Sequence, residues 1–427
     1  MATPPRVIVI GAGFGGLEAA KRLAGKAVSV LLIDQNNYHL FTPLLYQVAS
    51  SLLNPSDIAQ PVRSIFRGAH NVRFRQARVA RIDFGGMAVV LEGGEALTYD
   101  FLVVAAGSTT NYFGLAGAAE RALGLKDLPE ALELRNHILT CLETASRLDA
   151  DAAAPWLTFV VVGGGPTGVE YAGALSELVR GVVPHEYPEL HARRIRIVLI
   201  EGMAELLPPF PPKLGAAARE ALEARRIEVV RGERVTGVAP DAVTLSNGET
   251  IAGRTLVWAA GVKAAPLAEA LEAPRSRSGR VEVDEQLRVR GQARVFAIGD
   301  IAGMMQDGKE VPMLSAPAMQ EARVVARNIL RTIAGEQLER FRYRDRGSMA
   351  TVGKNTAVAS IGPLRLTGFL GWLTWLAVHL YYIIGFRNRF TVLMGWAWNY
   401  FRGDRPVRII TRAKAADREA EPPEAAG

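Results

Sequence analysis

Three glycines near the start of the chain have the spacing that holds a dinucleotide phosphate. Gly11, Gly13 and Gly16 follow an apolar run over 7–10 that predicts a buried strand, and an apolar helix pattern continues to Arg22. The first glycine permits a tight turn, the second lets the backbone approach a pyrophosphate, and the third lets the helix lie close to the strand. The helix N-terminus then presents N–H groups and a positive dipole to the phosphates.

The elements after this motif favour a dinucleotide site over a plain tight turn. A second strand, predicted over 28–33, ends on Asp34, whose carboxylate can accept hydrogen bonds from the ribose hydroxyls of adenosine. Strand, glycine turn, helix, strand and acid in this order are typical of a dinucleotide-binding fold. Gln35, the next residue, is assigned to the same site.

The same pattern occurs again in the middle of the chain. Gly163, Gly165 and Gly168 follow an apolar run over 159–162, and the next predicted strand, over 195–200, ends on Glu201. Two Rossmann-type folds in one α/β chain can hold a resident flavin at one site and an exchangeable nicotinamide nucleotide at the other. By analogy with proteins of this build, the N-terminal copy is expected to take the flavin.

Glu201 predicts which nicotinamide nucleotide is used. Its carboxylate can accept from both ribose hydroxyls of NADH, whereas the 2′-phosphate of NADPH would place two negative groups close together. Gly202, Met203 and Ala204 follow it, so the local sequence offers no arginine to neutralise that phosphate. We therefore expect a strong preference for NADH.

The composition narrows the chemistry further. The 427 residues are 49% hydrophobic, with a mean hydropathy of +0.11 and a formal net charge of +7, which suits an anionic substrate or an anionic membrane surface. Cys141 is the single cysteine, which excludes a redox-active disulfide within the chain and a cysteine-ligated iron–sulfur cluster. Residues 1–6 lead directly into the first strand, so we expect no signal peptide, and we expect neither a metal site nor a nucleic-acid partner.

Further predicted strands end where a cofactor could meet the backbone. Strands over 100–106 and 255–260 are followed by Gly107 and Gly261, and a strand over 294–298 leads to Asp300. Asp300 is interpreted as a partner for the ribityl hydroxyls of a flavin, with a turn-forming acid as the alternative. The segment 37–48 is rich in aromatic and polar residues, and it either lines a pocket for a flat ring or forms a packed irregular loop.

The order of these segments predicts the domain organisation. Residues 1–120 and 276–335 are assigned to the two parts of an FAD-binding domain, 121–155 to a connecting helix and linker, and 156–275 to an NADH-binding domain. A small antiparallel sheet is predicted over 72–83, 89–91 and 96–99, and the linker itself over 149–155. Residues 336–427 are assigned to a C-terminal membrane-anchor or dimer region, which ends in a disordered tail over 415–427.

The C-terminal region is rich in aromatic residues. Four of the six tryptophans lie within 366–401, in two apolar stretches over 368–386 and 390–401 with a polar hinge at 387–389 between them. Because Trp and Tyr suit the headgroup boundary better than the hydrocarbon centre, we expect amphipathic helices that lie on the membrane. A soluble dimer interface is the alternative. Basic side chains expected to meet anionic lipid follow, namely Arg402, Arg405, Arg408, Arg412 and Lys414.

Taken together, these motifs resemble type II NADH:quinone oxidoreductase, the single-subunit respiratory dehydrogenase that does not pump protons. The resemblance extends over essentially the whole chain, with matching stretches at 11–16, 37–49, 163–173, 297–300, 316–320 and 386–390. It implies hydride transfer from NADH to FAD, transfer of two electrons to a membrane quinone, and a homodimer on the cytoplasmic face of the plasma membrane. Sulfide:quinone oxidoreductases need paired cysteines that this chain lacks, and a soluble NADH-dependent reductase of ferredoxin or rubredoxin is the alternative.

The resemblance also implies roles for single residues. Glu170, two residues after the last glycine of the second motif, is placed in the first turn of the following helix. It is either a charged or proton-bearing group near the flavin and quinone, or a carboxylate that favours a helix N-terminus. Gln320 suits a quinone carbonyl or the flavin edge and is the second catalytic candidate, and Tyr46 and Gln47 are candidates for the quinone channel. FAD contacts are implied for Ala12, Gly13, Phe14, Gly15, Gly16, Val79, Asp300, Met319 and Gln320.

Overall fold

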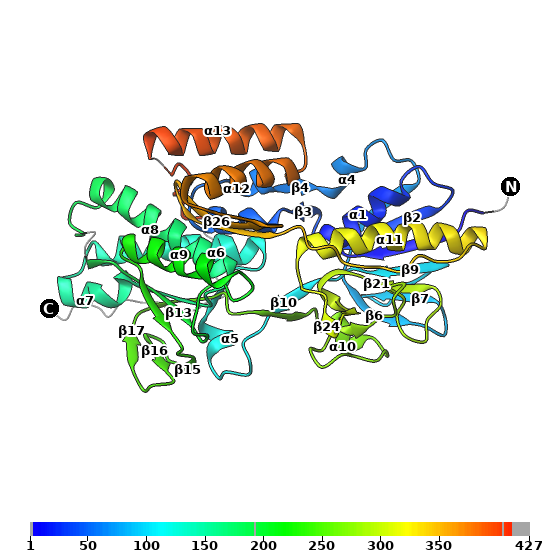
Figure 1. Ribbon diagram of the computed structural model, residues 1–427, viewed down its shortest axis with the longest axis horizontal. Helices are drawn as coiled ribbons and strands as arrows, with labels where there is room; N and C mark the ends of the chain where they lie inside the picture. The colour runs from blue at the N-terminus through cyan, green and yellow to red at the C-terminus, as the bar shows by residue number, and fades with distance from the viewer. Residues whose placement is uncertain (1–2, 192–193, 404, 412–427) are drawn as a thin grey trace.

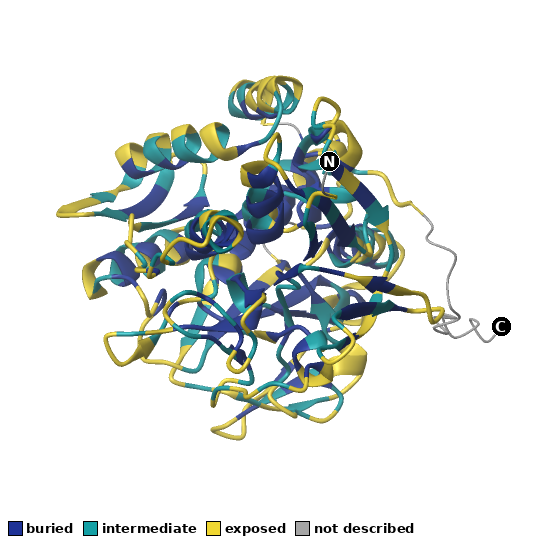
Figure 2. Ribbon diagram, turned by 90° about the vertical axis from the view of Figure 1, so that its right-hand side faces the viewer, coloured by how far each residue is buried: buried dark blue, intermediate teal, exposed yellow. Residues whose placement is uncertain are grey.

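The computed structural model describes residues 3–191, 194–403 and 405–411, which form two α/β lobes lying side by side (Figure 1). The first lobe carries the N-terminal glycine motif and the second lobe carries the mid-chain motif. A C-terminal module of three strands and two helices lies across one long side of the molecule. Buried residues fill the strands, while the outer loops and outer helix faces are exposed (Figure 2).

The first lobe is built on a five-stranded parallel sheet in the order β21-β9-β1-β2-β5. Because β1 lies between β2 and β9, the connections leave it in opposite directions, and the carboxyl end of β1 is where such sheets bind ligands. Helices α1 (Phe14–Leu23) and α11 (Ser315–Ala334) lie against one another beside this sheet. The strands are β1 (Arg6–Ile10), β2 (Ser29–Asp34), β5 (Val72–Gln76), β9 (Phe101–Val104) and β21 (Val295–Ala297).

The second lobe repeats this architecture, which confirms the predicted second dinucleotide-binding fold. Its parallel sheet has the order β11-β18-β12-β13-β14, so β12 lies between β13 and β18 as β1 lies between β2 and β9. The strands are β11 (Leu123–Gly124), β12 (Thr158–Val162), β13 (Arg196–Glu201), β14 (Glu228–Arg231) and β18 (Thr255–Trp258). The long helices of this lobe are α6 (Leu128–Ala145), α8 (Pro166–Glu186) and α9 (Pro212–Ala224).

Each lobe also carries a three-stranded antiparallel sheet. The prediction that 72–83 belongs wholly to such a sheet is wrong, because Val72–Gln76 pairs in parallel with β2 at the edge of the first sheet. Buried and exposed residues alternate along this edge strand, and that pattern is also typical of a half-buried antiparallel strand. The antiparallel strands are β6 (Val79–Asp83), β7 (Ala88–Leu91), β8 (Ala96–Thr98), β15 (Val235–Val238), β16 (Ala242–Leu245) and β17 (Thr250–Ala252).

The two lobes are joined by paired strands as well as by the chain. Strand β10 (Ser108–Thr110) of the first lobe pairs antiparallel with β19 (Val262–Ala264), which follows the second sheet. The segment 149–155 is not an open linker. It contains α7 (Ala150–Ala153) and the start of η2 (Ala154–Leu157), because the Asp149 carboxylate caps the first turn.

The C-terminal module is an antiparallel sheet covered by two helices. Its strands are β25 (Ser348–Gly353), β26 (Thr356–Ile361) and β27 (Leu364–Thr367), and its helices are α12 (Gly368–Tyr382) and α13 (Phe386–Arg402). Strand β25 lies against α8 of the second lobe, and α12 lies on β26. The predicted hinge at 387–389 is wrong: α13 already begins at Phe386, and the chain turns just before it at Gly385, where φ is +89°.

Within the residues described, none of the helices has the length and apolarity needed to cross a bilayer. The tail over 415–427 lies outside the described residues. The remaining elements are short, namely β3 (Tyr38–Leu40), η1 (Thr42–Leu44), α2 (Leu45–Ala49), α3 (Pro55–Ile58), β4 (Ala59–Pro61), α4 (Val62–Ile65), α5 (Ala118–Arg121), α10 (Leu267–Ala270), β20 (Val281–Glu282), η4 (Gly299–Ile301), β22 (Ala302–Gly303), β23 (Met305–Gln306) and β24 (Lys309–Glu310).

Candidate active site

Close backbone contacts shape the first glycine turn. The Gly11 N–H donates to the Ile33 carbonyl at 2.7 Å, which ties the turn to the end of β2. A Cβ on Gly16 would lie 1.8 Å from the Gly11 carbonyl oxygen, so only glycine lets α1 start this close to the turn. A Cβ on Gly13 would meet no atom within 4 Å, so the backbone there faces open space. This is the geometry that a pyrophosphate needs.

Asp34 lies beside this turn at the end of β2. One of its oxygens accepts from the Ala12 N–H at 2.6 Å and the other from the Asn36 N–H at 2.7 Å. Burial raises the pKa of Asp34, and the two backbone donors oppose that shift. His39, which sequence reasoning missed, bonds the Ala12 carbonyl through Nδ1 at 2.8 Å. Because burial lowers the pKa of His39 to about 4, the ring is neutral and Nδ1 is the donor.

The second glycine turn has the same construction. The Gly163 N–H donates to the Ile200 carbonyl at 2.8 Å, and a Cβ on Gly168 would lie 1.8 Å from the Gly163 carbonyl oxygen. Glu201 takes the place of Asp34: its two oxygens accept from the Gly164 N–H at 2.6 Å and from the Met203 N–H at 2.8 Å. Each lobe therefore presents a helix N-terminus beside a carboxylate that backbone donors hold in place.

Both turns open onto one cavity of about 2330 Å³. The residues predicted for the two sites fall into two groups, those that line this cavity and those that do not. Those behind the turns, which shape them without lining the cavity, are Ala12, Gly16 and Gly168. Those that line the cavity are Gly11, Gly13, Phe14, Gly15, Asp34, Gln35, Tyr46, Val79, Gly107, Gly163, Gly165, Glu170, Glu201, Gly261 and Asp300.

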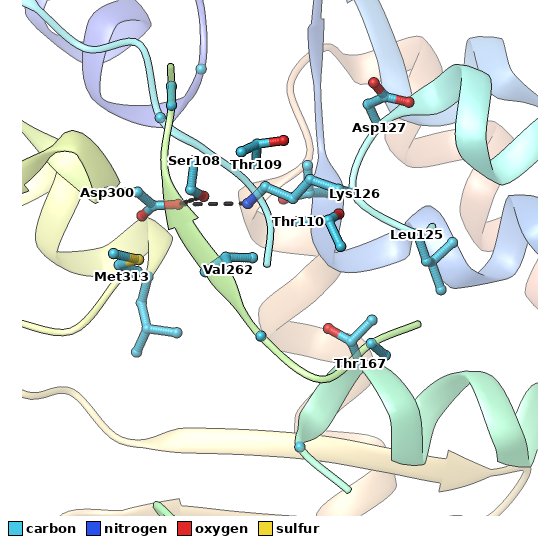
Figure 3. A pocket seen from close by; sticks show the side chains of 18 of the residues that line it. Ser108, Thr109, Thr110, Leu125, Lys126, Asp127, Thr167, Val262, Asp300 and Met313 are labelled. Atoms are coloured by element: carbon cyan, nitrogen blue, oxygen red, sulfur yellow. Dashed lines mark hydrogen bonds and ion pairs between the residues drawn. The ribbon is translucent and has the colours of Figure 1, made fainter. Parts of the chain in front are cut away.

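Asp300 lies where the two lobes meet, beside Ser108 and Lys126 (Figure 3). The Ser108 hydroxyl donates to Asp300 Oδ2, and Lys126 Nζ lies 3.6 Å from the same oxygen. Arg280 holds this turn from behind: it is 2% exposed, and its Nε donates to the Asp300 carbonyl at 3.1 Å. Neither Lys126 nor Arg280 belongs to a recognisable motif, so nothing in the local sequence marks them.

Gln320 and Met319 do not line the cavity. Gln320 Nε2 donates to the Arg344 carbonyl at 3.0 Å, and its Oε1 accepts from the Arg344 N–H at 3.1 Å. Both ends of the amide are therefore occupied by the main chain that leads to β25. In this arrangement Gln320 positions that segment, and the start of α11 contributes Ser315 and Ala316 to the cavity instead.

Glu170 lies in the second turn of α8, not in the first, because the helix begins at Pro166. The residue is 9% exposed, and its Oε1 accepts from the Thr351 N–H at 3.3 Å and from Trp375 Nε1 at 3.2 Å. Burial raises the pKa of Glu170 to about 8, and the two donors oppose that shift. A carboxyl group that is protonated at neutral pH therefore lies in the cavity wall.

A second cavity, of about 50 Å³, is bordered by α12 and α13. It shares Tyr46 and Glu170 with the large cavity. Gln47 Nε2 donates to the Tyr46 hydroxyl at 2.9 Å, and Trp396 Nε1 donates to Gln47 Oε1 at 2.8 Å. These hydrogen bonds tie α2, which forms the end of the aromatic segment 37–48, to α13.

Two tryptophans assigned to the membrane surface are buried instead. Trp375 is 1% exposed and Trp396 is 8% exposed. Their indole N–H groups donate to Glu170 and Gln47, which explains why they face inward: a buried Trp needs an acceptor, and these polar residues supply it. Composition alone could not distinguish an inward from an outward tryptophan on these helices.

The assignment of Arg405 to anionic lipid is also wrong. Arg405 is 2% exposed, donates to the Ser50 carbonyl at 2.8 Å and forms an ion pair with Glu177 at 2.8 Å. The chain beyond α13 therefore runs back over the protein, and Arg408 pairs there with Glu186. Two of the remaining basic residues of that prediction lie outside the described residues, namely Arg412 and Lys414.

Comparisons with known proteins agree with this architecture. A family model described as pyridine nucleotide-disulphide oxidoreductase matches residues 5–322, and one described as the NDH2 C-terminal domain matches residues 346–404. The type II NADH:quinone oxidoreductase Ndh of Mycobacterium tuberculosis is 40% identical over 97% of this chain and 92% of its own length. The chain belongs to the type II NADH:quinone oxidoreductase family.

More distant members and neighbours share the fold. A mitochondrial internal alternative NAD(P)H-ubiquinone oxidoreductase of Arabidopsis thaliana is 31% identical over 95% of this chain and 86% of its own length. The structure of NDH2 from Plasmodium falciparum in complex with NADH superimposes with a TM-score of 0.89 at 22% identity, covering 96% of this chain and all of that one. The type II NADH:quinone oxidoreductase fold therefore includes the C-terminal module.

A sulfide:quinone oxidoreductase from Aquifex aeolicus has a related fold, with a TM-score of 0.71 at 19% identity over 93% of this chain and 95% of that one. The single cysteine of this type II NADH:quinone oxidoreductase family member, Cys141, lies buried on α6 and lines neither cavity. Burial raises the pKa of its thiol to about 11, so it stays protonated. Cysteine redox chemistry therefore has no group here to perform it.

Glu321 is a buried carboxyl group behind the Asp300 turn. Its Oε2 accepts from the Gly299 N–H, and among the described residues its Oε1 has no partner. Burial raises the pKa of Glu321 from 4.5 to about 7, opposed by the Gly299 N–H and by Arg280. The folded protein then keeps a proton that the unfolded chain releases, so the free energy of unfolding falls as pH rises through this window, and the loss persists above about pH 7.

We therefore expect Glu321→Gln to stabilise the protein at pH 8 and to change its stability little near pH 4.5. Glutamine can still accept from the Gly299 N–H but carries no charge to bury. The gain is on the order of 3 kcal/mol, since each pKa unit corresponds to about 1.4 kcal/mol. Thermal midpoints of both proteins across pH measure it. Equal destabilisation at every pH would contradict the expectation.

Proposed function

We propose that the protein oxidises NADH and passes two electrons, through bound FAD, to a membrane quinone. One observation carries this proposal: two dinucleotide turns, each beside an acid held by backbone N–H groups, open onto a single cavity. At Tyr46 and Glu170 that cavity meets the second one, which α12 and α13 border. A nicotinamide nucleotide and an apolar acceptor can thus reach the same interior by different routes.

The first lobe has the residues to hold FAD. The open backbone at Gly13 and the N-terminus of α1 would meet the pyrophosphate, and Asp34 would accept from the adenosine ribose. Asp300 would accept from the ribityl hydroxyls, with Lys126 beside it to limit the cost of the buried charge. When bound, FAD accepts a hydride and releases its two electrons to a second substrate.

The second lobe presents a matching set of residues for NADH. A Cβ on Gly165 would meet no atom within 4 Å, so the backbone there is open as it is at Gly13. Glu201 lies in the cavity wall beside this turn, where its carboxylate would accept from the adenosine ribose. The names of the relatives, an NADH:quinone oxidoreductase and an NAD(P)H-ubiquinone oxidoreductase, support a nicotinamide donor and a quinone acceptor.

In this proposal, Tyr46, Gln47 and Glu170 form the site where the quinone binds and is reduced. Burial raises the pKa of Tyr46 well above its ordinary value, so the phenol stays protonated. Its oxygen accepts from Gln47 Nε2, which leaves the phenolic proton to donate to a quinone oxygen. Glu170 holds a second proton below about pH 8. Reduction of a quinone to a quinol needs two protons, and these two groups hold them at the entrance from the C-terminal helices.

The exposed faces of α12 and α13 support a membrane surface as the source of the quinone. Large exposed apolar side chains on these two neighbouring helices favour an interaction site, and helices rich in aromatic and apolar residues can bind in the plane of the lipid interface. A homodimer and a position on the cytoplasmic face of the plasma membrane belong to the same proposal. The exposed large apolar residues of these helices are Phe369, Leu370, Leu373, Tyr381, Tyr382, Phe386, Phe390, Leu393, Met394, Trp398 and Phe401.

We expect replacement of Leu370, Leu373, Phe390 and Phe401 by glutamine to weaken binding to anionic liposomes about a thousandfold, because each such side chain contributes about 1 kcal/mol at the interface and about 1.4 kcal/mol corresponds to a factor of ten. FAD content should be unchanged, since all four side chains are exposed. Deletion of both helices is a poorer test because it also removes the buried Trp375.

The matched control replaces two apolar residues that are exposed elsewhere, Leu148 and Ile333, by glutamine. This control should float with liposomes like the unchanged protein. Undiminished flotation of the fourfold variant would contradict a membrane surface on these helices. Light scattering of the same proteins reports whether the patch instead joins two copies of the chain.

Steady-state NADH oxidation by the purified, yellow protein tests the proposed function. The acceptors are a soluble quinone, a ferredoxin, a rubredoxin and oxygen, each at matched concentration. We expect fast turnover with the quinone and slow turnover with the others. Turnover with a protein acceptor alone would instead establish a soluble reductase of a small electron carrier.

A further inference from the structure

Arg234 lies beside the acid of the second dinucleotide site. It belongs to the turn between β14 and β15, and β14 pairs with β13 in a register that sets Arg231 opposite Glu201. Because neighbouring parallel strands end at the same edge of a sheet, the residues after β14 arrive next to those after Glu201. A Cβ on Gly202 would lie 3.0 Å from Cγ and 3.5 Å from Nε of Arg234, so this side chain lies directly against Gly202.

The main chain of Arg234 is held, whereas its guanidinium is unpaired. Its N–H donates to Ser246 Oγ at 3.0 Å, and its carbonyl accepts from the Ser246 N–H at 2.8 Å. Among the residues that the structure describes, nothing forms a hydrogen bond or ion pair with the guanidinium, although Arg234 lines the large cavity. The nearby Arg231, by contrast, donates to the Ala204 carbonyl at 2.7 Å and pairs with Glu205 at 2.9 Å.

Three charged groups face this part of the cavity. Glu201 is held by two backbone N–H groups, and Glu233 accepts from the Ser246 hydroxyl, so both carboxylates already have donors. Arg234 is the cation among them, and it follows Glu233 in the same turn. The residues that follow Glu201 in the sequence include no arginine, as expected, but the tertiary fold brings Arg234 beside Gly202 from the turn after β14.

We propose that Arg234 is a further specificity-determining residue, which contacts the 2′-phosphate at the adenosine end of NADPH. The proposal rests on the proposed function, because it assigns a second determinant to the same site. A guanidinium offers forked N–H donors that match phosphate oxygens, and it is always charged. Arg234 thereby offsets part of the repulsion from Glu201, so the site accepts NADPH better than Glu201 alone would allow.

Two nucleotide fragments test this on the full-length, FAD-loaded protein. Adenosine 2′,5′-bisphosphate carries the distinguishing phosphate and AMP does not, and calorimetry measures the binding of each. We expect Arg234→Ala to weaken binding of the bisphosphate about tenfold and binding of AMP less than about twofold. The bisphosphate affinity of Arg234→Lys should lie between those of the unchanged protein and Arg234→Ala. The KM for NADPH should rise in parallel with the loss of bisphosphate affinity.

Arg196→Ala is the matched control, because it removes the same charge from the same lobe. Arg196 pairs with Glu228 at 2.7 Å and does not line the cavity, so both fragments should bind this variant as they bind the unchanged protein. Equal weakening of both fragments by Arg234→Ala, or no change in either, would overturn the role of Arg234. If the unchanged protein binds neither fragment and does not oxidise NADH, the proposed function is contradicted. If it binds neither fragment but oxidises NADH, the proposed function stands and the role of Arg234 is contradicted.

Discussion

Replacing Glu170 by glutamine should slow quinone reduction about a hundredfold, which is within the range that a positioned acid contributes to a rate. The Glu170 carboxyl lies in the walls of both cavities, and its raised pKa of about 8 keeps it protonated at neutral pH. Glutamine has nearly the same size and can still accept from Thr351 and Trp375, but it has no acidic proton to deliver to the quinone.

Comparing the turnover rates with a soluble quinone and with ferricyanide as acceptors measures this effect. Ferricyanide takes electrons without protons, so its reduction should differ little between the two proteins. Glu220→Gln, on the exposed part of α9, is the control for the substitution itself. Equal slowing with both acceptors would mean that Glu170 supports the structure of the site rather than supplying a proton.

The pH profile of the unchanged protein should carry the same signature. The carboxyl is neutral below its pKa of about 8 and charged above it, so its proton is lost as pH rises through that value. Quinone turnover should therefore decline above about pH 8, and Glu170→Gln should lack that limb of the profile. Identical profiles for the two proteins would contradict the assignment.

The unchanged protein should prefer NADH to NADPH by about 2–4 kcal/mol in kcat/KM, and Glu201 should be the main cause. Both oxygens of this carboxylate accept from backbone N–H groups of the glycine turn and of Met203, which holds it in the cavity wall where the ribose would lie. A 2′-phosphate there meets a fixed negative charge, and it loses the hydrogen bond that a hydroxyl would donate.

Glu201→Gln should weaken the binding of NADH, because an amide offers one acceptor oxygen instead of two. It should also reduce the difference in kcat/KM between NADH and NADPH. Specificity constants for both nucleotides measure the change, and FAD content, which depends on the other lobe, serves as the internal control. If Arg234 contributes as proposed, combining Glu201→Gln with Arg234→Ala restores part of the preference for NADH. Equal efficiency with NADH and NADPH in the unchanged protein would contradict the assignment of the second site to NADH.

The two dinucleotide folds could be predicted from the sequence because their signals are local. The glycine spacing, the apolar strands and the acids at the strand ends all lie within short stretches of chain, and each has a backbone requirement that few residues satisfy. Gly16 shows this most directly, because a Cβ there would lie 1.8 Å from a carbonyl oxygen. The absence of a cysteine pair is likewise a property of the sequence alone.

The composition of the C-terminal region predicted two helices but not the direction of their side chains. Trp375 and Trp396 belong to the same aromatic stretch as the exposed Phe390 and Phe401, yet they face inward to donate to Glu170 and Gln47. Arg405 is buried for a similar reason, because Glu177 and the Ser50 carbonyl satisfy its charge and its donors. Each partner lies far away in the sequence, so no local pattern contains it.

The sequence by itself determined the two dinucleotide motifs and the acid that follows each one. Its single cysteine also excluded electron transfer through a disulfide within the chain. Only the tertiary structure decided which polar groups meet in the walls of the cavities. In the folded protein the Gln320 amide bonds the Arg344 main chain, and Arg234 lies against Gly202. The physical reason is that backbone turns depend on neighbouring residues, whereas the pairing of buried charges and donors depends on which strands and helices the fold brings into contact.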